Sequence, residues 1–280
     1  MVNLVPLDSR AHRNLRVSRH SSPQTVQVDA VSVIPREFQR LVAHYPIFFT
    51  KNAESARFEP AVLLGFQKQE NLYFAEGRWD VAYVPLQIQR QPFSLVPHRS
   101  EAPGEGQGSV DIAIDMSSSQ VQTGEGERLF DDNGQPSRYL QSITSMLSAL
   151  VSGSTEGYAF TDKLAELNLL EPVGINIEFV DRSETKLQGL YWIAAAALKA
   201  LSGAQLAELR DRDFLEWLYF QMASVSHVSS LVARKNQLLS GVTTERPARE
   251  SPAGTTERPA RESPAGTPPR HPGTSDVGPG

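Results

Sequence analysis

The 280-residue chain contains no cysteine. This absence excludes disulfide bonds, thiolate zinc sites, iron–sulfur clusters and cysteine nucleophiles together, because each of them requires a thiol. The short motifs of P-loop enzymes (GxxxxGKS or GxxxxGKT), of serine hydrolases (GxSxG) and of zinc proteases (HExxH) are absent as well. The sequence therefore favours a protein that is not an enzyme, although a site assembled from distant segments stays open.

Histidine pairs that could hold a metal are also missing. The six histidines lie at positions 12, 20, 44, 98, 227 and 271. No two of them are three or four residues apart, which is the spacing that places two ligands on one helix face. We therefore expect no metal and no cofactor.

Long apolar runs are absent too. The opening residues MVNLVPLDSRAHRNLRV lack the apolar core of about 7–15 residues that a secretory signal has. The most apolar run, residues 189–201, is too short to span a bilayer and contains Lys199. We expect no transmembrane segment and, by default, a cytoplasmic location, with export by a route that needs no N-terminal signal left open.

The chain has no excess of positive charge. Its formal net charge is −5 and its pI is near 5.7, which argues against a nucleic-acid partner. Arginines at positions 10, 13, 16 and 19 are spaced three apart. They are interpreted as part of a solvated N-terminal arm; on a helix they would instead form a cationic stripe that could bind an anionic surface.

The last forty residues differ in composition from the rest. The unit TTERPARESPAG occupies residues 243–254 and recurs unchanged at 255–266. Residues 241–280 contain eight prolines and almost no apolar side chains, so burial cannot offset the entropy lost on folding. We predict a globular domain over residues 1–240 and a disordered tail, rich in Pro, Gly, Arg and Glu, over 241–280. A linker or a recognition tail is the functional alternative.

Strands and helices are both predicted in the body of the chain. Apolar and polar residues alternate over 110–116 and 173–179, and shorter apolar runs lie at 46–50, 61–66 and 71–74. A strand partner is expected near 186–193, and the Pro/Gly/Ser-rich stretch 97–109 is expected to be an exposed loop. Leucines and isoleucines at helical spacing predict a helix that starts after Ser137 and ends at Gly153.

Two further helices are predicted. One ends near Asn168, and the longest runs from about Asp211 to Gln237. Most strands precede most helices, and the order is not the regular βαβ alternation of a doubly wound fold. The predicted fold class is therefore α+β, with a strand-rich N-terminal half and a helix-rich C-terminal half in one domain.

Candidate site residues come from two segments. His44 and Tyr45 precede a predicted strand, and His44 could act as a base or a ligand, or could simply pack in a turn. The region Arg78–Phe93 is the densest mixture of guanidinium and aromatic groups, and its candidates are Arg78, Trp79, Tyr83, Arg90 and Phe93. Such a mixture suits an anionic or flat ligand, whereas the structural alternative is an arginine that binds carbonyls in a proline-broken turn.

The chain resembles the SapC family from about Leu4 to Asn236. The resemblance rests on a series of motifs that are specific only in combination: HYPIFF at 44–49, PAVLLG at 60–65, ENLYF at 70–74, GRW at 77–79, AYVP at 82–85 and RQPF at 90–93. The chain departs from the family at Ile193–Ala195, near which members tend to carry an acidic residue.

The resemblance implies a bacterial protein, named for genes that accompany a crystalline surface layer and its export. It implies no reaction. We therefore expect an accessory or interaction protein of a bacterial envelope or surface-layer system, with protein partners from that system. The alternative is a small-ligand-binding protein or an enzyme that uses the Arg78–Phe93 region.

Overall fold

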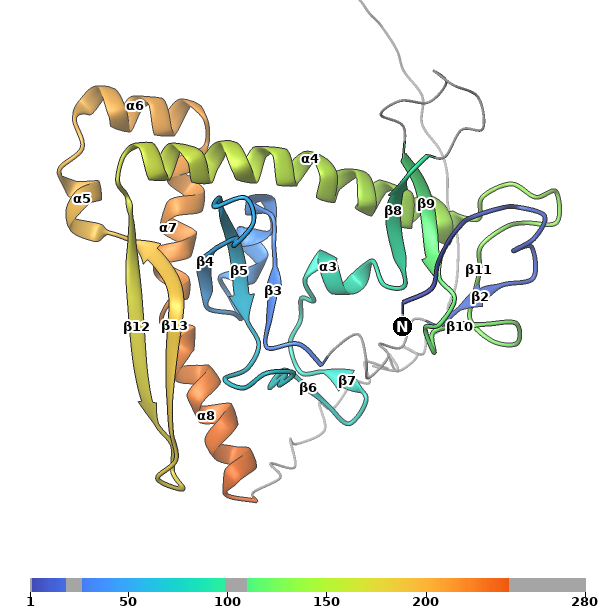
Figure 1. Ribbon diagram of the computed structural model, residues 1–280, viewed down its shortest axis with the longest axis horizontal. Helices are drawn as coiled ribbons and strands as arrows, with labels where there is room; N and C mark the ends of the chain where they lie inside the picture. The colour runs from blue at the N-terminus through green and yellow to red at the C-terminus, as the bar shows by residue number, and fades with distance from the viewer. Residues whose placement is uncertain (1, 19–26, 99–109, 242–280) are drawn as a thin grey trace, which may run out of the picture. The chain divides into compact units, whose positions relative to one another are not determined.

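The computed structural model describes residues 2–18, 27–98 and 110–241 (Figure 1). Of these residues 35% are helical and 27% lie in strands, so the predicted α+β class is confirmed. Contacts between residues join Met1–Thr243 into one unit. The predicted tail beyond Gly241 and the predicted loop beyond His98 lie outside the described residues. None of the described helices is both long enough and apolar enough to cross a membrane.

The main sheet is antiparallel and has the order β12-β13-β4-β5-β3. Its strands are β12 (Leu170–Glu178), β13 (Glu184–Ile193), β4 (Ile47–Lys51), β5 (Phe58–Leu63) and β3 (Ala30–Ser32). Three consecutive residues of β4, Ile47, Phe48 and Phe49, are fully buried. Because successive side chains of a strand point to opposite faces, this central strand is covered on both sides. Most of the predicted strands are confirmed, but of residues 71–74 only Phe74 lies in a strand, β6 (Phe74–Ala75).

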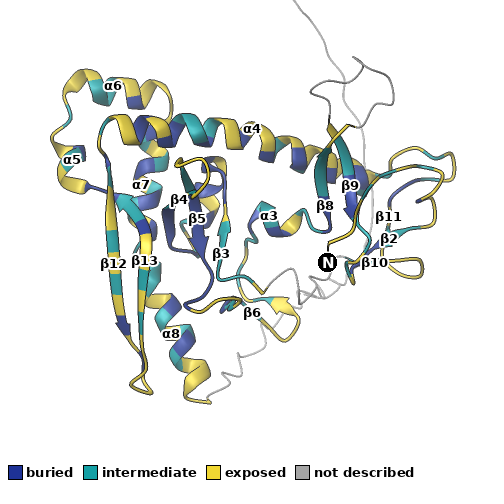
Figure 2. Cartoon of the chain, in the orientation of Figure 1, coloured by how far each residue is buried: buried dark blue, intermediate teal, exposed yellow. Residues whose placement is uncertain are grey.

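Helix α4 (Arg138–Glu166) begins where the sequence predicted, with the Ser137 hydroxyl accepting from the Leu140 amide. The predicted end at Gly153 is wrong, because the helix continues without a break for 29 residues. Gly153 is buried against Ile34, where an added Cβ would lie 2.5 Å from the Ile34 Cδ1 atom. The glycine therefore allows a close approach between two segments and does not end the helix. Figure 2 shows α4 buried along one face and exposed along the other.

The C-terminal part contains α5 (Ala195–Lys199), α6 (Gly203–Asp211), α7 (Phe214–Ser224) and α8 (His227–Leu239). The predicted single helix over 211–237 is wrong, because α7 and α8 are separate. Two side chains near the end of α7 form hydrogen bonds with the backbone of strand β4. Gln221 donates to the Ile47 carbonyl at 2.9 Å, and the Ser224 hydroxyl accepts from the Ile47 amide at 2.9 Å. These bonds satisfy the backbone amide and carbonyl of the first residue of β4, and they lie where the helix is interrupted.

Most buried apolar residues of the described ranges fall into two clusters. The first cluster surrounds β4 and contains Phe49, Phe160 and Leu218. The second cluster contains Val17, Phe93 and Ile114 and lies against the N-terminal half of α4 through Leu140, Ile143 and Leu147. Helix α4 therefore contributes to both clusters, with its first half in one and its second half in the other.

Small sheets surround the second cluster. Strands β1 (Leu4–Pro6) and β8 (Phe93–Pro97) flank β9 (Val110–Asp115), and β2 (Arg16–Val17) lies between β10 (Val121–Gln122) and β11 (Glu127–Arg128).

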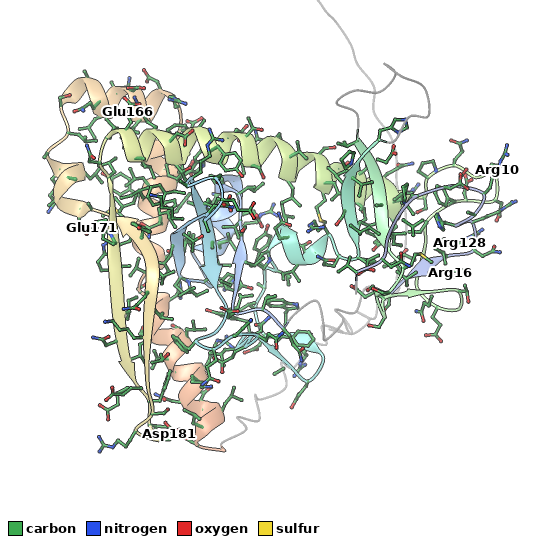
Figure 3. The ribbon with its side chains drawn as sticks, in the orientation of Figure 1. Arg10, Arg16, Arg128, Glu166, Glu171 and Asp181 are labelled. Carbon is green, nitrogen blue, oxygen red and sulfur yellow. The ribbon has the colours of Figure 1, made fainter. Side chains whose placement is uncertain are left out.

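The early arginines do not form a helical stripe. Residues 9–14 are turns and Arg16 begins β2, while Arg19 lies outside the described residues. Arg13 donates to the Asp132 carbonyl, and Arg16 donates to the Gly126 carbonyl at 3.0 Å. Figure 3 labels Arg10, Arg16 and Arg128 in this part of the chain. Two of the arginines therefore hold loops in place.

Candidate functional site

Tyr45 belongs to the first cluster, and His44 directly precedes it in the chain. Tyr45 is fully buried, and the edge of its ring meets the His44 ring at 6.2 Å between centroids. Burial lowers the pKa of His44 and raises the pKa of Tyr45. Both changes favour the neutral side chains near neutral pH.

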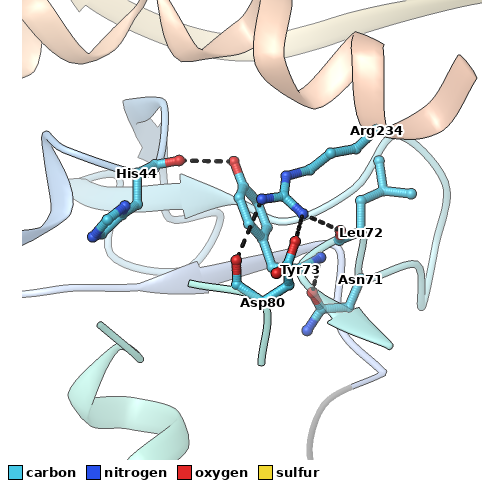
Figure 4. Close-up of polar contacts among 6 residues, drawn as sticks. All are labelled: His44, Asn71, Leu72, Tyr73, Asp80 and Arg234. Atoms are coloured by element: carbon cyan, nitrogen blue, oxygen red, sulfur yellow. Dashed lines mark hydrogen bonds and ion pairs between the residues drawn. The ribbon is translucent and has the colours of Figure 1, made fainter. Parts of the chain in front are cut away.

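A second buried tyrosine, Tyr73, lies next to His44 (Figure 4). The Tyr73 hydroxyl donates to the His44 carbonyl at 3.1 Å, and burial raises the pKa of Tyr73 to about 12. Arg234 of α8 lies with its Cζ atom 4.7 Å from the centre of the Tyr73 ring and donates to Asp80 Oδ2 at 2.9 Å. The neighbouring Lys235 pairs with Glu70. We call these five residues, Glu70, Tyr73, Asp80, Arg234 and Lys235, the α8 clamp, since they join α8 to the segment that follows β5.

Arg78 and Trp79 form the short strand β7 (Arg78–Trp79), which pairs with β6. The Arg78 side chain is 77% exposed and lies 3.8 Å from the Glu76 carboxylate. Trp79 is partly buried, and its ring meets Phe74 at 6.0 Å between centroids. The two adjacent candidates therefore differ, with Arg78 in solvent and Trp79 packed.

Arg90 and Phe93 stabilise the turn before β8. Arg90 donates to the Phe93 carbonyl and to the Ser94 hydroxyl, and its Nε atom donates to Gln87 at 2.6 Å. Burial lowers the pKa of Arg90. Phe93 is fully buried in the second cluster. These contacts correspond to the structural alternative, an arginine that binds carbonyls in a proline-broken turn.

A cleft of about 610 Å³ lies between the two clusters. We call it the Tyr83 cleft. It is lined by Ser18 and Gln120, by Arg40 of α2 (Phe38–Leu41), by Trp79, Ala82, Tyr83, Val84, Ile88, Gln89 and Gln91, and by Tyr139, Ser142, Ile143 and Met146 of α4. Of the seven predicted site residues the structure brings Trp79 and Tyr83 together on its wall. His44, Tyr45, Arg78, Arg90 and Phe93 do not line it, and their role as ligand-binding residues stays a prediction.

Tyr83 is fixed from two sides. The Tyr45 hydroxyl donates to the Tyr83 carbonyl at 2.7 Å, and the Tyr83 hydroxyl donates to Glu37 Oε1 at 2.9 Å. The Glu37 carboxylate also accepts from the amide of Leu86, the first residue of α3 (Leu86–Gln89), at 2.8 Å. Burial raises the pKa of Glu37, and burial together with the nearby Glu37 charge raises the pKa of Tyr83. This wall of the cleft is therefore held rigidly by buried hydrogen bonds.

The described lining of the Tyr83 cleft carries positive charge and no negative charge. Among the described residues that form it, Arg40 is charged and no aspartate, glutamate or histidine is present. The Arg40 Cζ atom lies 5.5 Å from the centre of the Tyr83 ring. Glu37 is close in sequence but lies behind Tyr83, where it is 3% exposed.

The opposite wall has a buried amide. Gln120 is 6% exposed, and its Nε2 atom donates to the Ser18 carbonyl at 3.3 Å. Its Oε1 atom is closed to solvent and has no hydrogen-bond partner among the described residues. Three aromatic rings, amides and one guanidinium suit the binding of a flat polar molecule. No group of three or more histidine, aspartate or glutamate side chains in the described part of the chain could hold a metal ion.

Sequence reasoning did not find Arg40, Glu37 and Gln120. Arg40 lies on a four-residue helix, and the sequence does not distinguish it from Arg36. Glu37 is an acidic residue within the largely apolar stretch 31–42, which is the one signal that could have marked it as buried and bonded.

Comparison with known proteins gives one match. A family model described as SapC matches residues 7–231. No curated protein and no solved structure matches the chain.

Proposed function

We propose that this chain, which belongs to the SapC family, is a binding protein that holds a small molecule in the Tyr83 cleft without transforming it. The observation that carries the proposal is the cleft itself. Its volume of about 610 Å³ lies within the range of sites that bind small molecules and cofactors. Its lining combines aromatic faces, amides and one cation, and the Tyr83 wall is fixed before any ligand arrives.

Binding is favoured over catalysis by the groups on the lining. General acid–base catalysis needs a group whose pKa lies near the working pH. The described lining offers hydroxyls, amides and a guanidinium for this purpose. The Tyr83 hydroxyl donates to Glu37 and has a raised pKa, and the Ser142 hydroxyl donates to the Tyr139 carbonyl of its own helix at 2.7 Å. Among the described residues the Ser142 hydroxyl has no adjacent base, and burial together with the Glu37 carboxylate raises the pKa of the Tyr83 hydroxyl and so opposes its ionisation.

A steric block tests the proposal. Ser142 and Ser145 are both exposed serines of α4 whose hydroxyls donate to carbonyls of the same helix, but Ser142 lines the cleft and Ser145 does not. Ser142→Trp should fill the cleft, whereas Ser145→Trp adds the same side chain outside it. The two variants should melt within a few degrees of the wild type, because neither serine is part of a cluster.

The measurement is saturation-transfer NMR with a mixture of nucleotides, aromatic amino acids and aromatic carboxylic acids. We expect at least one compound to bind the wild type and Ser145→Trp and to lose its signal with Ser142→Trp. Equal binding to all three proteins, or binding to none, would refute the proposal.

A second candidate function is supported by the family. The SapC match extends over most of the chain, and the resemblance connects it with a bacterial envelope or surface-layer system. We propose as the second candidate an accessory or interaction protein of such a system. Affinity capture of the full chain from native lysate separates the two candidates, if proteins and small molecules are quantified in the same eluate. Envelope proteins captured equally by the wild type and by Ser142→Trp, with no small molecule, would favour this candidate.

A further inference from the structure

We infer that the ligand of the Tyr83 cleft is an organic anion with a planar ring, and that Arg40 is the residue that recognises its negative charge. The inference rests on the proposed binding function and names the ligand class for that site. Arg40 was not among the residues that the sequence singled out.

The first argument is that Arg40 lacks a carboxylate partner. Eight of the fourteen described arginines pair with a carboxylate, as Arg36 does with Glu156 and Arg234 with Asp80. Arg40 is exposed, and within the described residues no carboxylate lies within ion-pair distance of its guanidinium. Its contacts are with Tyr83: the Cζ atom lies 5.5 Å from the ring centre, and the guanidinium is close enough to the Tyr83 hydroxyl to offset part of the rise in its pKa that burial causes.

The second argument is that the nearest carboxylate is already occupied. Glu37 lies one helical turn before Arg40, but its two oxygens accept from the Tyr83 hydroxyl and from the amides of Leu86 and Ile34. This carboxylate is buried behind Tyr83 and attracts Arg40 without contacting it. A guanidinium has five N–H donors, so donors that are not directed at Tyr83 remain for a molecule in the cleft. A guanidinium fits a carboxylate, sulfonate or phosphate group.

The third argument is the shape of the lining. Arg40 lies over one flat ring, Tyr83, and the rings of Trp79 and Tyr139 belong to the same cleft. A planar ring in the ligand can stack on such faces while its acidic group reaches Arg40. The volume of about 610 Å³ suits a ligand of this size.

Two fluorescent probes distinguish recognition of the negative charge from recognition of the aromatic ring. They are 1-anilinonaphthalene-8-sulfonate and N-phenyl-1-naphthylamine, which share their aromatic skeleton and differ in the sulfonate. We expect Arg40→Gln to weaken binding of the sulfonate about tenfold and to leave binding of the neutral probe within about twofold, since a hydrogen bond to a charged group contributes that much. Arg40→Lys should restore part of the loss, because it keeps the charge without the planar fork. Arg78→Gln is the matched control, with the same charge change at an exposed arginine of the neighbouring hairpin.

The outcomes distinguish this inference from the proposed function. If Ser142→Trp leaves both probes bound as in the wild type, the cleft is not the binding site and the proposed function is contradicted. If Ser142→Trp abolishes both but Arg40→Gln weakens the two probes equally or not at all, the cleft binds and the role of Arg40 is refuted. A larger loss of the sulfonate with Arg78→Gln than with Arg40→Gln would also overturn the assignment.

Discussion

Two arginines of this protein lie over tyrosine rings, and their surroundings differ. Arg234 of the α8 clamp covers Tyr73 at 4.7 Å and binds Asp80, and Lys235 beside it binds Glu70. Arg40 covers Tyr83 at 5.5 Å and has no carboxylate within ion-pair distance among the described residues. The clamp uses its charges to join segments of the fold, whereas the cleft leaves its charge facing an open space. The same residue pair therefore joins segments of the fold in one place and, in our proposal, binds a ligand in the other.

The largest effect that this comparison predicts is at Lys235. The Lys235 and Glu70 side chains are 11% and 16% exposed, so Lys235→Met leaves a largely buried carboxylate without its partner. We expect the free energy of unfolding to fall by about 3 kcal/mol, as measured by urea denaturation. The double variant Glu70→Gln, Lys235→Met should lose less than the single one. A single variant as stable as the wild type would show that the clamp does not hold α8.

A smaller effect is expected at Arg234. Arg234→Gln removes the contacts with Asp80 and with the Tyr73 ring and should cost about 1–2 kcal/mol of unfolding free energy. Arg40→Gln should change it by less than about 0.5 kcal/mol, because an exposed side chain whose contacts are with Tyr83 contributes little. Both variants should be measured side by side by urea denaturation. Similar losses of unfolding free energy would contradict the claim that Arg234 stabilises the fold and Arg40 does not.

The wall of the cleft should respond to pH through Glu37. Burial raises the pKa of this carboxyl above its ordinary value of 4.5, so the folded chain binds the proton more tightly than the unfolded chain. The stability from this group is therefore present below the ordinary pKa and is lost as pH rises through the folded pKa. We expect the unfolding free energy of the wild type, minus that of Glu37→Gln, to fall as pH rises from about 4 to about 7. A difference that is constant or rises with pH would contradict the direction of the shift.

The smallest effect is expected from the end of the chain. A chain that ends at Gly241 keeps both clusters, the clamp and the cleft. We propose that residues 1–240 fold independently, so truncation should change the unfolding free energy by less than about 0.5 kcal/mol and should leave probe binding unchanged. Loss of folding or of probe binding on truncation would mean that the repeat segment contributes to the domain.

The sequence predicted local features better than distant ones. Strands β4, β9 and β12 were found because alternation and apolar runs are visible within a few residues. Gly153 was misread as a helix end, because a glycine at a helix end and a glycine against Ile34 look the same without the partner. The break between α7 and α8 was missed for a similar reason, since Ser224 and Gln221 bind the distant strand β4.

In the candidate site, too, the residues that share one segment were predicted and those from distant segments were not. Trp79 and Tyr83 were selected as a local mixture of aromatic and guanidinium groups, and both line the cleft. The opposite wall comes from Gln120 and Tyr139, and the cation comes from Arg40, all of them outside the selected segment. Arg78 and Arg90 were selected for their residue type, but the exposure of one and the carbonyl contacts of the other depend on the fold.

The methionine methyl groups provide the most direct test of the Tyr83 cleft. Of the four methionines, Met146 lines the cleft and Met222 packs against the first cluster. With the methyl groups labelled with carbon-13, titration of 1-anilinonaphthalene-8-sulfonate should move the Met146 resonance progressively and leave Met222 in place. A probe that binds while Met146 stays unmoved would contradict the account.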